Sequence, residues 1–285
     1  MLSSQPATAF STLRRRAYEL VAPRLRGDGP LIPPAGLHAV GDSDFRATGD
    51  EFLRLFVELA ALRPDERVLD VGCGVGRIAR ALTGYLDERG SYDGFDVARV
   101  AIRWCTRHYA RHSNFTFTHV NVANSSYNPD GAVPAERFSF PYPPSSFDFA
   151  FLTSVFTHMM SPAVERYLQE IARMLAPGGR CLLTFFLLDD EARKLIGEGR
   201  STQLFQLSQL PYAIVDAEHP EAAVAFDEDW VLSRLAEASL RARMPLRHGS
   251  WCGRDDFTSY QDIVIADVLP DRPSARGSSC SARTR

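Results

Sequence analysis

A group of glycines follows an acid in the stretch VLDVGCGVGRIA, where an apolar run turns into a helical pattern. Gly72, Gly74 and Gly76 allow a tight turn and a close approach of the backbone to a ligand. A dinucleotide-binding turn reads G-x-G-x-x-G, but Arg77 stands at the place of its third glycine. Asp70 precedes the turn, and a carboxylate there repels a pyrophosphate but suits an amino group. A tight turn without a ligand stays open as the alternative.

A second acid lies where a nucleoside ligand would need it. Asp96 comes twenty residues after Gly76, at the end of the apolar segment Ser91–Ala98. An acidic side chain at that place commonly accepts hydrogen bonds from ribose hydroxyls. Asp93 lies earlier in the segment, away from the carboxyl end where open α/β sheets bind ligands. The two acids therefore predict a ribose at Asp96 and a cationic group near Asp70.

The segments that must position these residues alternate between short apolar strands and amphipathic helices. Such alternation predicts an α/β fold with a parallel sheet and right-handed crossovers. Strands are predicted at 67–72, 91–98, 115–123, 147–154, 180–188, 240–251 and 259–269. Helices are predicted at 49–62, 77–86, 100–111, 162–175 and 227–240, and a PGG turn at Pro177–Gly179 ends the fourth of them.

Three segments depart from this alternation within the 285 residues. Residues 1–48 predict an N-terminal helical extension or lid with a helix at 14–25, although the Ser/Arg-rich start also resembles a transit peptide. Residues 189–225 are predicted to form an insertion over one end of the sheet. Residues 271–285 are basic, small and polar, which predicts a disordered tail. The main domain is expected at 49–270.

Charge and cysteine content limit the classes of partner and compartment. The net charge of −3 provides no general attraction to nucleic acid or anionic lipid. The five cysteines are scattered without a CxxC pair, which argues against a disulfide framework and a zinc site. No apolar stretch approaches the roughly 20 residues of a membrane span. These features predict a cytoplasmic protein without a metal, a nucleic-acid partner or a membrane segment.

The pattern D-x-G-C-G-x-G-R, followed by an acid at the end of the next strand, resembles the class I S-adenosylmethionine-dependent methyltransferases of bacterial small-molecule type. YDGFDVA, FTFTHVNVAN, FSFPYPPSSFDFAFLTSVFTHM and EIARMLAPGGRCLLTFF are similar to further motifs of that family, in the family's order, over about Asp65–Leu188. SYQDIVIADV resembles its last strand. The resemblance implies a Rossmann-like, seven-stranded sheet, mostly parallel with an antiparallel last strand, and helices on both faces.

The resemblance also implies which residues bind S-adenosyl-L-methionine. Asp70 would lie near its amino group, Asp96 at its ribose, and Ser154 beside the methyl donor. Asn121 stands where the family usually has Asp at the adenine, and an amide oxygen can still accept a hydrogen bond. Arg77 would meet the carboxylate, although a solvated position on the helix is an equal alternative. The full set is Asp70, Gly72, Cys73, Gly74, Gly76, Arg77, Asp96, Val97, Asn121, Val122, Ser154 and Phe156.

Methyl transfer to oxygen needs alignment and a base, and His158 in SVFTHMM is the predicted base. A histidine that only caps the next helix or closes the pocket is the alternative. The long loop and the hairpin before the last strand both lie on the predicted ligand side. They offer acceptor-site candidates, for each of which simple packing stays open: Tyr127, Tyr142, Trp251, Arg254 and Tyr260.

The sequence therefore predicts a monomeric or homodimeric enzyme that methylates a small molecule. A hydroxyl of a saccharide or secondary metabolite is the expected acceptor. Two alternatives remain: a non-catalytic S-adenosylmethionine-binding protein, and a nicotinamide-dependent oxidoreductase, against which the missing glycine and Asp70 count. The fourth strand ends in LTSVFTH and lacks the Asn-Pro-Pro-Tyr or Pro-Cys motif of base methylases, which disfavours nucleic-acid methylation.

Overall fold

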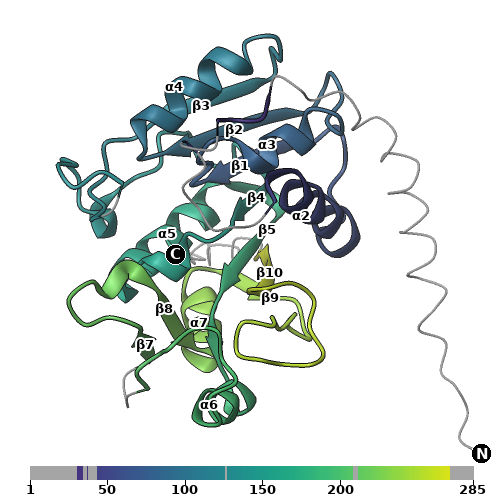
Figure 1. Ribbon diagram of the computed structural model, residues 1–285. Coiled ribbons are helices and arrows are strands. Elements are labelled where there is room, and N and C mark those ends of the chain that lie inside the picture. The colour runs from purple at the N-terminus through teal and green to yellow at the C-terminus, as the bar shows by residue number, and fades with distance from the viewer. Residues whose placement is uncertain (1–30, 35–36, 38–43, 126, 208–210, 270–285) are drawn as a thin grey trace, which may run out of the picture.

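A seven-stranded sheet in the order β3-β2-β1-β4-β5-β10-β9 forms the centre of the computed structural model (Figure 1). The model describes residues 31–34, 37, 44–125, 127–207 and 211–269. β10 is antiparallel to β5 and β9, and the other pairs are parallel. This arrangement confirms the predicted Rossmann-like sheet with its antiparallel last strand. The strands are β1 (Arg67–Val71), β2 (Ser91–Asp96), β3 (Phe115–His119), β4 (Phe147–Leu152), β5 (Leu175–Phe185), β9 (Leu240–Ala242) and β10 (Asp262–Val268).

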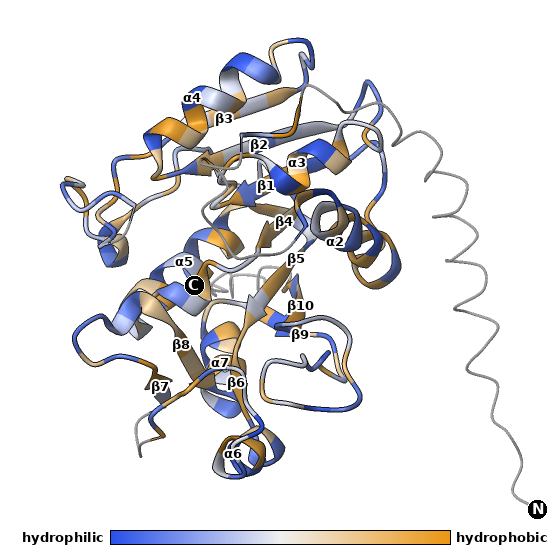
Figure 2. Cartoon of the chain, in the orientation of Figure 1, coloured by the Kyte–Doolittle hydropathy of each residue, from blue (hydrophilic) through white to orange (hydrophobic). Residues whose placement is uncertain are grey.

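Alternating side chains on the strands create a separate core on each face of the sheet. Phe149 and Phe151 of β4 pack against Phe56 on one face, with ring centroids 5.0 and 4.6 Å away. Ala150 and Leu152 join the core on the other face. The apolar colouring of β4 and β5 in Figure 2 reflects this burial on both sides. The first face is covered by α2 (Phe45–Ala60), α3 (Arg77–Leu82) and α4 (Arg99–His108), and the second by α5 (Ser161–Met174) and α7 (Glu228–Glu237).

The predicted insertion contains a second, three-stranded sheet in the order β6-β8-β7. β5 ends at Phe185 and the chain continues almost directly into β6 (Leu187–Leu188), so this unit begins two residues earlier than predicted. Its core includes Phe186 and Trp251, the latter from the segment before β10. Its other elements are α6 (Asp190–Gly197), β7 (Tyr212–Ile214), η6 (Pro220–Ala222) and β8 (Val224–Asp227).

Two of the element boundaries that differ from the sequence expectations have a local cause. The strand predicted for 240–251 shrinks to the three residues of β9, because Pro245 cannot donate a ladder hydrogen bond. The turn predicted at Pro177–Gly179 lies within β5 as an irregularity, where the register with β4 shifts and Gly178 has φ +80°. The helix expected at 14–25 and the tail at 271–285 lie outside the described residues.

A buried ion pair ties the amino ends of the strands to α2. The Arg180 guanidinium bonds both carboxylate oxygens of Glu66, at 2.9 and 2.7 Å, and Glu66 is 2% exposed. Arg180 also donates to the backbone carbonyls of Ala60, the last residue of α2, and of Ala61, its C-cap, at 2.6 and 2.9 Å. These bonds hold the base of the sheet together, opposite the edge where ligands are expected. Within the described ranges, no helix is long and apolar enough to cross a membrane.

Candidate active site

The glycine turn between β1 and α3 adopts a conformation that its three glycines make accessible. Gly72, Gly74 and Gly76 all have left-handed φ values, of +81°, +52° and +76°. A Cβ on Gly72 would meet Val155, and one on Gly76 would meet the Tyr109 ring, whereas a Cβ on Gly74 would meet no atom within 4 Å. Other side chains therefore pack against both ends of the turn, at Gly72 and Gly76, while the space beside Gly74 in its middle is open. This space leaves room for a ligand against the backbone.

Asp96, at the end of β2, holds this turn in place. One of its carboxylate oxygens accepts from the Gly74 amide at 2.7 Å, and the other accepts from the Ala98 amide at 2.7 Å. Burial raises the pKa of Asp96, while the backbone amides that it accepts from act in the opposite direction. The carboxylate is only partly buried and lies beside the open middle of the turn. A ribose diol fits an acceptor in that position.

Asp70 lies under the turn in β1 and is 2% exposed. The Tyr92 hydroxyl on β2 donates a 2.6 Å hydrogen bond to its carboxylate. Burial raises the pKa of Asp70 to about 8, and the charge of Asp96 acts in the same direction. Cys73 is also buried, with its side chain packed beside Gly94, so Cys73 can face a ligand only through its backbone. The ligand-free chain therefore keeps a proton on Asp70 at neutral pH, and the carboxylate would carry a charge toward the site only after losing it.

The predicted adenine residues follow β3 and are partly occupied by local contacts. The Asn121 side chain is exposed, and its amide oxygen accepts from the Asn128 side chain at 3.2 Å. Val122 is 2% exposed and bridges to Val133. Val97 and Arg77 are both half-buried, and burial lowers the pKa of the Arg77 guanidinium. An open cradle at Gly74, a carboxylate for the ribose and an amide oxygen for the adenine together fit S-adenosylmethionine.

The end of β4 is held by bonds to the neighbouring strand β5 and to the residue just before β10. The Ser154 amide donates to the Thr184 hydroxyl at 2.8 Å, and the Ser154 hydroxyl donates to the side-chain oxygen of Gln261 at 3.1 Å. Ser154 has φ +56° and stays partly exposed at the sheet edge. Phe156 is fully buried and stacks on Phe185, so it belongs to the core instead of bordering the methyl donor as predicted.

His158 closes the 3-10 helix η5 (Phe156–His158), just after β4. Its Nδ1 lies 3.0 Å from the backbone carbonyl of Glu221 in the predicted insertion. A carbonyl can only accept, so Nδ1 carries the hydrogen, and the Nε2 of the neutral ring is left as an acceptor. This tautomer can take a proton at Nε2.

A cavity of about 510 Å³ lies between the loop after β3 and the start of α5. His158 is not one of its lining residues but bonds the backbone of one of them, Glu221. Most of its wall is small and apolar, and two carboxylates line it, from Glu136 and Glu221. The Ser125 hydroxyl donates to the Glu221 carboxylate at 2.7 Å. The lining residues contain no lysine or arginine, so this cavity favours a neutral or cationic occupant over an anion.

Two predicted acceptor residues have structural roles. Trp251 is fully buried, and its indole N–H donates to the buried Asp262 carboxylate at 2.6 Å. Because of this burial, Trp251 offers no surface to an acceptor, contrary to its prediction as an acceptor-site residue. Arg254 is 8% exposed and forms ion pairs with Asp189 and Glu191, so it is not available to an acceptor.

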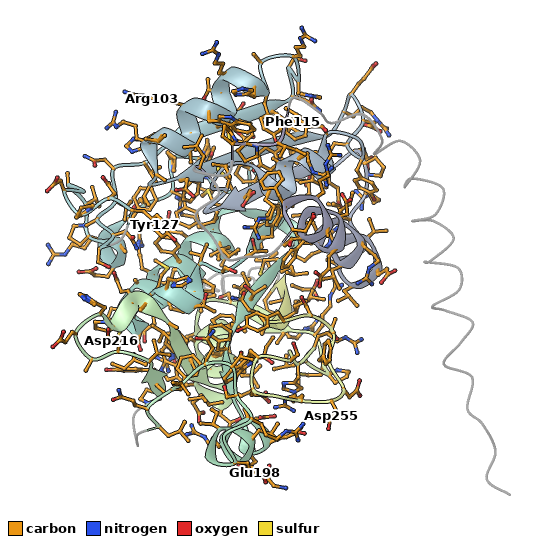
Figure 3. All side chains as sticks on the ribbon, viewed as in Figure 1. Arg103, Phe115, Tyr127, Glu198, Asp216 and Asp255 are labelled. Carbon is orange, nitrogen blue, oxygen red and sulfur yellow. The ribbon has the colours of Figure 1, made fainter. Side chains whose placement is uncertain are left out.

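The remaining three predicted residues are tyrosines in different surroundings. Tyr142 is partly buried against the core, with its ring centroid 5.0 Å from that of Phe147 and 6.3 Å from that of Phe95, which indicates a packing role. Tyr127 is 45% exposed on the loop after β3 (Figure 3). Tyr260 is 44% exposed, and its hydroxyl bonds the side chains of Thr202 and Gln203 at 2.9 Å. Tyr127 and Tyr260 thus keep surfaces that a ligand could reach.

Sequence reasoning missed three residues that shape the site. Tyr92 holds Asp70, Gln261 holds Ser154, and the Glu221 carbonyl fixes the His158 tautomer. Gln261 lies in the segment SYQD, directly before the last strand, so the sequence could have predicted that it lies near the carboxyl ends of the parallel strands. A backbone carbonyl carries no such signal, because any residue type provides one.

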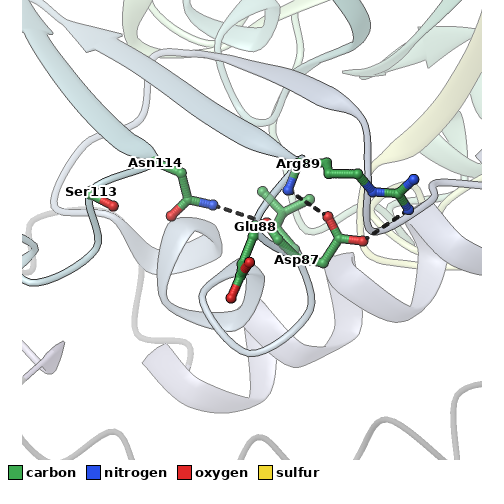
Figure 4. A pocket seen from close by; sticks show the side chains of 6 residues that line it. Asp87, Glu88, Arg89, Ser113 and Asn114 are labelled. Carbon is green, nitrogen blue, oxygen red and sulfur yellow. Dashed lines mark hydrogen bonds and ion pairs between the residues drawn. The ribbon is translucent and has the colours of Figure 1, made fainter.

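A second cavity, of about 620 Å³, lies at the opposite edge of the sheet (Figure 4). It lies beside the turns that precede β2 and β3, and its Asp87 and Arg89 side chains pair with each other at 3.3 Å. The Asn114 amide donates to the Asp87 and Gly90 carbonyls. These bonds stabilise the turns, and the cavity is remote from the glycine turn and His158.

The family model described as a methyltransferase domain matches residues 44–224. Phthiotriol/phenolphthiotriol dimycocerosates methyltransferase 1 of Mycobacterium ulcerans is 31% identical over 50% of this chain and 46% of its own length. Fatty-acid O-methyltransferase of Mycolicibacterium smegmatis is 33% identical over 60% of this chain and 58% of its length. The chain thus spans about half the length of these curated relatives.

The fold is also found among solved structures. The PH0226 protein of Pyrococcus horikoshii superposes with a TM-score of 0.53 at 15% identity, over 81% of this chain and 93% of that one. The family match covers the glycine turn, Asp96, the end of β4 and His158, so it includes the residues from which the site is built. The chain belongs to the class I S-adenosylmethionine-dependent methyltransferases.

Proposed function

We propose that this protein transfers a methyl group from S-adenosylmethionine to an oxygen atom of a small neutral molecule. The observation that carries the proposal is the fixed ring of His158, with Nδ1 bound to the Glu221 carbonyl and Nε2 left to accept a proton. A base at the end of β4 suits a hydroxyl acceptor, whose oxygen becomes a better nucleophile as its proton leaves.

When bound, S-adenosylmethionine supplies a methyl group that is already activated by its sulfonium charge. The protein's task is then mainly to align donor and acceptor, which can contribute several kcal/mol. The turn Gly72–Gly76 would hold the methionine part, Asp96 the ribose hydroxyls, and Asn121 with Val122 the adenine. His158 would take the acceptor proton at Nε2.

The 510 Å³ cavity is the proposed acceptor site, and its lining favours a hydroxylated secondary metabolite over a saccharide. Small apolar side chains suit an apolar skeleton, whereas a sugar would leave many hydroxyls without partners. One relative is named for a fatty acid, which shares the apolar skeleton of the proposed class but not its neutral head group. Glu136 and Glu221 would repel an acceptor that carries a free carboxylate, so a neutral alcohol is the proposed class.

The proposed setting is the cytoplasm, with the protein as a monomer or homodimer and no nucleic-acid partner. Four free and buried cysteines among the described residues support a reducing compartment. They are Cys73, Cys105, Cys181 and Cys252.

Release of S-adenosylhomocysteine with a panel of hydroxylated apolar acceptors tests the function. His158→Gln should lower kcat about 100-fold or more and leave the dissociation constant for S-adenosylhomocysteine unchanged. His108→Gln is the matched control, because His108 also places Nδ1 on a backbone carbonyl, that of Trp104 at 2.8 Å, but lies on α4. Full activity of His158→Gln would refute the base. Binding of S-adenosylhomocysteine without turnover of any acceptor would favour a non-catalytic protein.

A further inference from the structure

Three potential metal ligands outside the active site converge from three distant segments. Asp189 follows β6, Glu228 begins α7, and His248 lies between β9 and β10. One ligand atom from each lies within 4.8 Å of the other two. The Nε2 atom of His248 is 3.8 Å from a Glu228 carboxylate oxygen and 4.0 Å from one of Asp189. One nitrogen and two carboxylates therefore face a common point.

A fourth side chain supports the histidine from behind. Asp262 is 1% exposed, and its carboxylate lies 3.6 Å from the Nδ1 atom of His248. Asp262 is itself fixed by three donors: the Leu187 and Gly249 amides at 2.7 Å and the Trp251 indole at 2.6 Å. Histidines that bind metals usually turn their other ring nitrogen to a carboxylate in this way. The histidine is thus oriented with Nε2 toward the two acids.

An unmet carboxylate oxygen and an excess of negative charge point independently to a cation at this place. The buried Oε2 of Glu228 has no hydrogen-bond partner within the described part of the chain, and it is the oxygen that lies 3.8 Å from the Nε2 atom of His248. Four carboxylates (Asp189, Glu191, Glu228 and Asp262) accompany one guanidinium, that of Arg254, which pairs with Asp189 and Glu191. Negative charge is therefore in excess when His248 is neutral, and a dication would reduce this excess.

We infer that Asp189, Glu228 and His248 form a structural site for a divalent transition-metal ion, with Zn²⁺ as its representative. An imidazole with two carboxylates suits zinc or a neighbouring metal, whereas Mg²⁺ and Ca²⁺ prefer oxygen ligands alone. The ion would join the ends of β6 and β8 to the segment before β10. The absence of paired cysteines led to the expectation of no metal, but it bears only on thiolate sites.

The test measures Zn²⁺ binding to the full chain after chelator treatment, by titration calorimetry and thermal unfolding. One Zn²⁺ should bind per chain and raise the unfolding temperature by several degrees at a hundredfold excess over its dissociation constant, and Mg²⁺ should not. His248→Gln and Glu228→Gln should each weaken binding about 100-fold, and Asp262→Asn 10- to 100-fold. His219→Gln, at an exposed histidine, should bind as the parent does.

Circular dichroism identifies any variant that fails to fold, and the isosteric Glu228→Gln then carries the test. Zn²⁺ binding that survives both Glu228→Gln and His248→Gln would overturn the site. So would a parent chain that binds no Zn²⁺ and whose stability responds only to pH, because a protonated His248 would then balance the acids without a metal.

Discussion

At the scale of single residues, Asp70 shows how burial under a turn changes a carboxylate. In the unfolded chain its pKa lies near the ordinary value of about 3.9, and in the folded chain burial raises it to about 8. Between these values the folded state holds a proton that the unfolded state has released. Stability therefore falls as pH rises through this range, by up to about 1.4 kcal/mol per pH unit.

Asp70→Asn should remove this pH dependence, because an amide does not titrate and can still accept from Tyr92. We expect the unfolding temperature of the ligand-free parent to fall from pH 5 to pH 8 relative to that of Asp70→Asn. Thermal unfolding across this range measures it, with Asp130→Asn, an exposed site, as the control. Parallel profiles of the parent and Asp70→Asn would show that Asp70 is already ionised in the folded chain.

At the scale of elements, the turn between β1 and α3 allows a substitution whose effect on the stability of the fold can be separated from its effect on the binding of the cofactor. Gly74→Ala places a methyl group in open space, so its cost to the fold is the left-handed backbone alone, about 1–2 kcal/mol. The same methyl group would occupy the proposed cofactor cradle. We expect the dissociation constant for S-adenosylhomocysteine to rise at least about tenfold, as measured by calorimetry.

Gly178→Ala is the matched control for that variant. Gly178 also has a positive φ, of +80°, and no atom within 4 Å of an added Cβ, but it lies at the start of β5. Gly178→Ala should lose a similar amount of stability and bind S-adenosylhomocysteine normally. Equal binding by both variants would mean that the cofactor does not pass over Gly74.

The elements also show which parts of the site could be predicted. The period of apolar residues and the glycine spacing predict the strands, the turn and Asp96, because these are local features of the chain. The residues that contact the acceptor were predicted less well than those of the turn. Trp251 and Arg254 lie at the expected edge, but whether a side chain points outward or into a core depends on β6 and α6, which are distant in sequence. No local pattern contains that information.

At the scale of the whole molecule, the Arg180–Glu66 pair couples β5, β1 and the end of α2. Arg180→Met should destabilise the protein by about 3–5 kcal/mol, because Glu66 would keep a buried charge with only Arg63 beside it. Adding Glu66→Met should recover much of that loss. Urea unfolding measures both, and Arg89→Met at an exposed ion pair should change stability by less than about 1 kcal/mol. A double variant no more stable than Arg180→Met would contradict this account.

The bond between the His158 ring and the Glu221 carbonyl has a consequence for anyone who builds chimeras of these enzymes. The segment at 189–225 looks like an exchangeable module, since it has a sheet and a core of its own. A transplanted module, however, would replace the carbonyl that sets the histidine tautomer. If the proposed function is correct, exchange of this segment would alter acceptor choice and proton transfer together, unless the graft keeps the backbone path through Glu221.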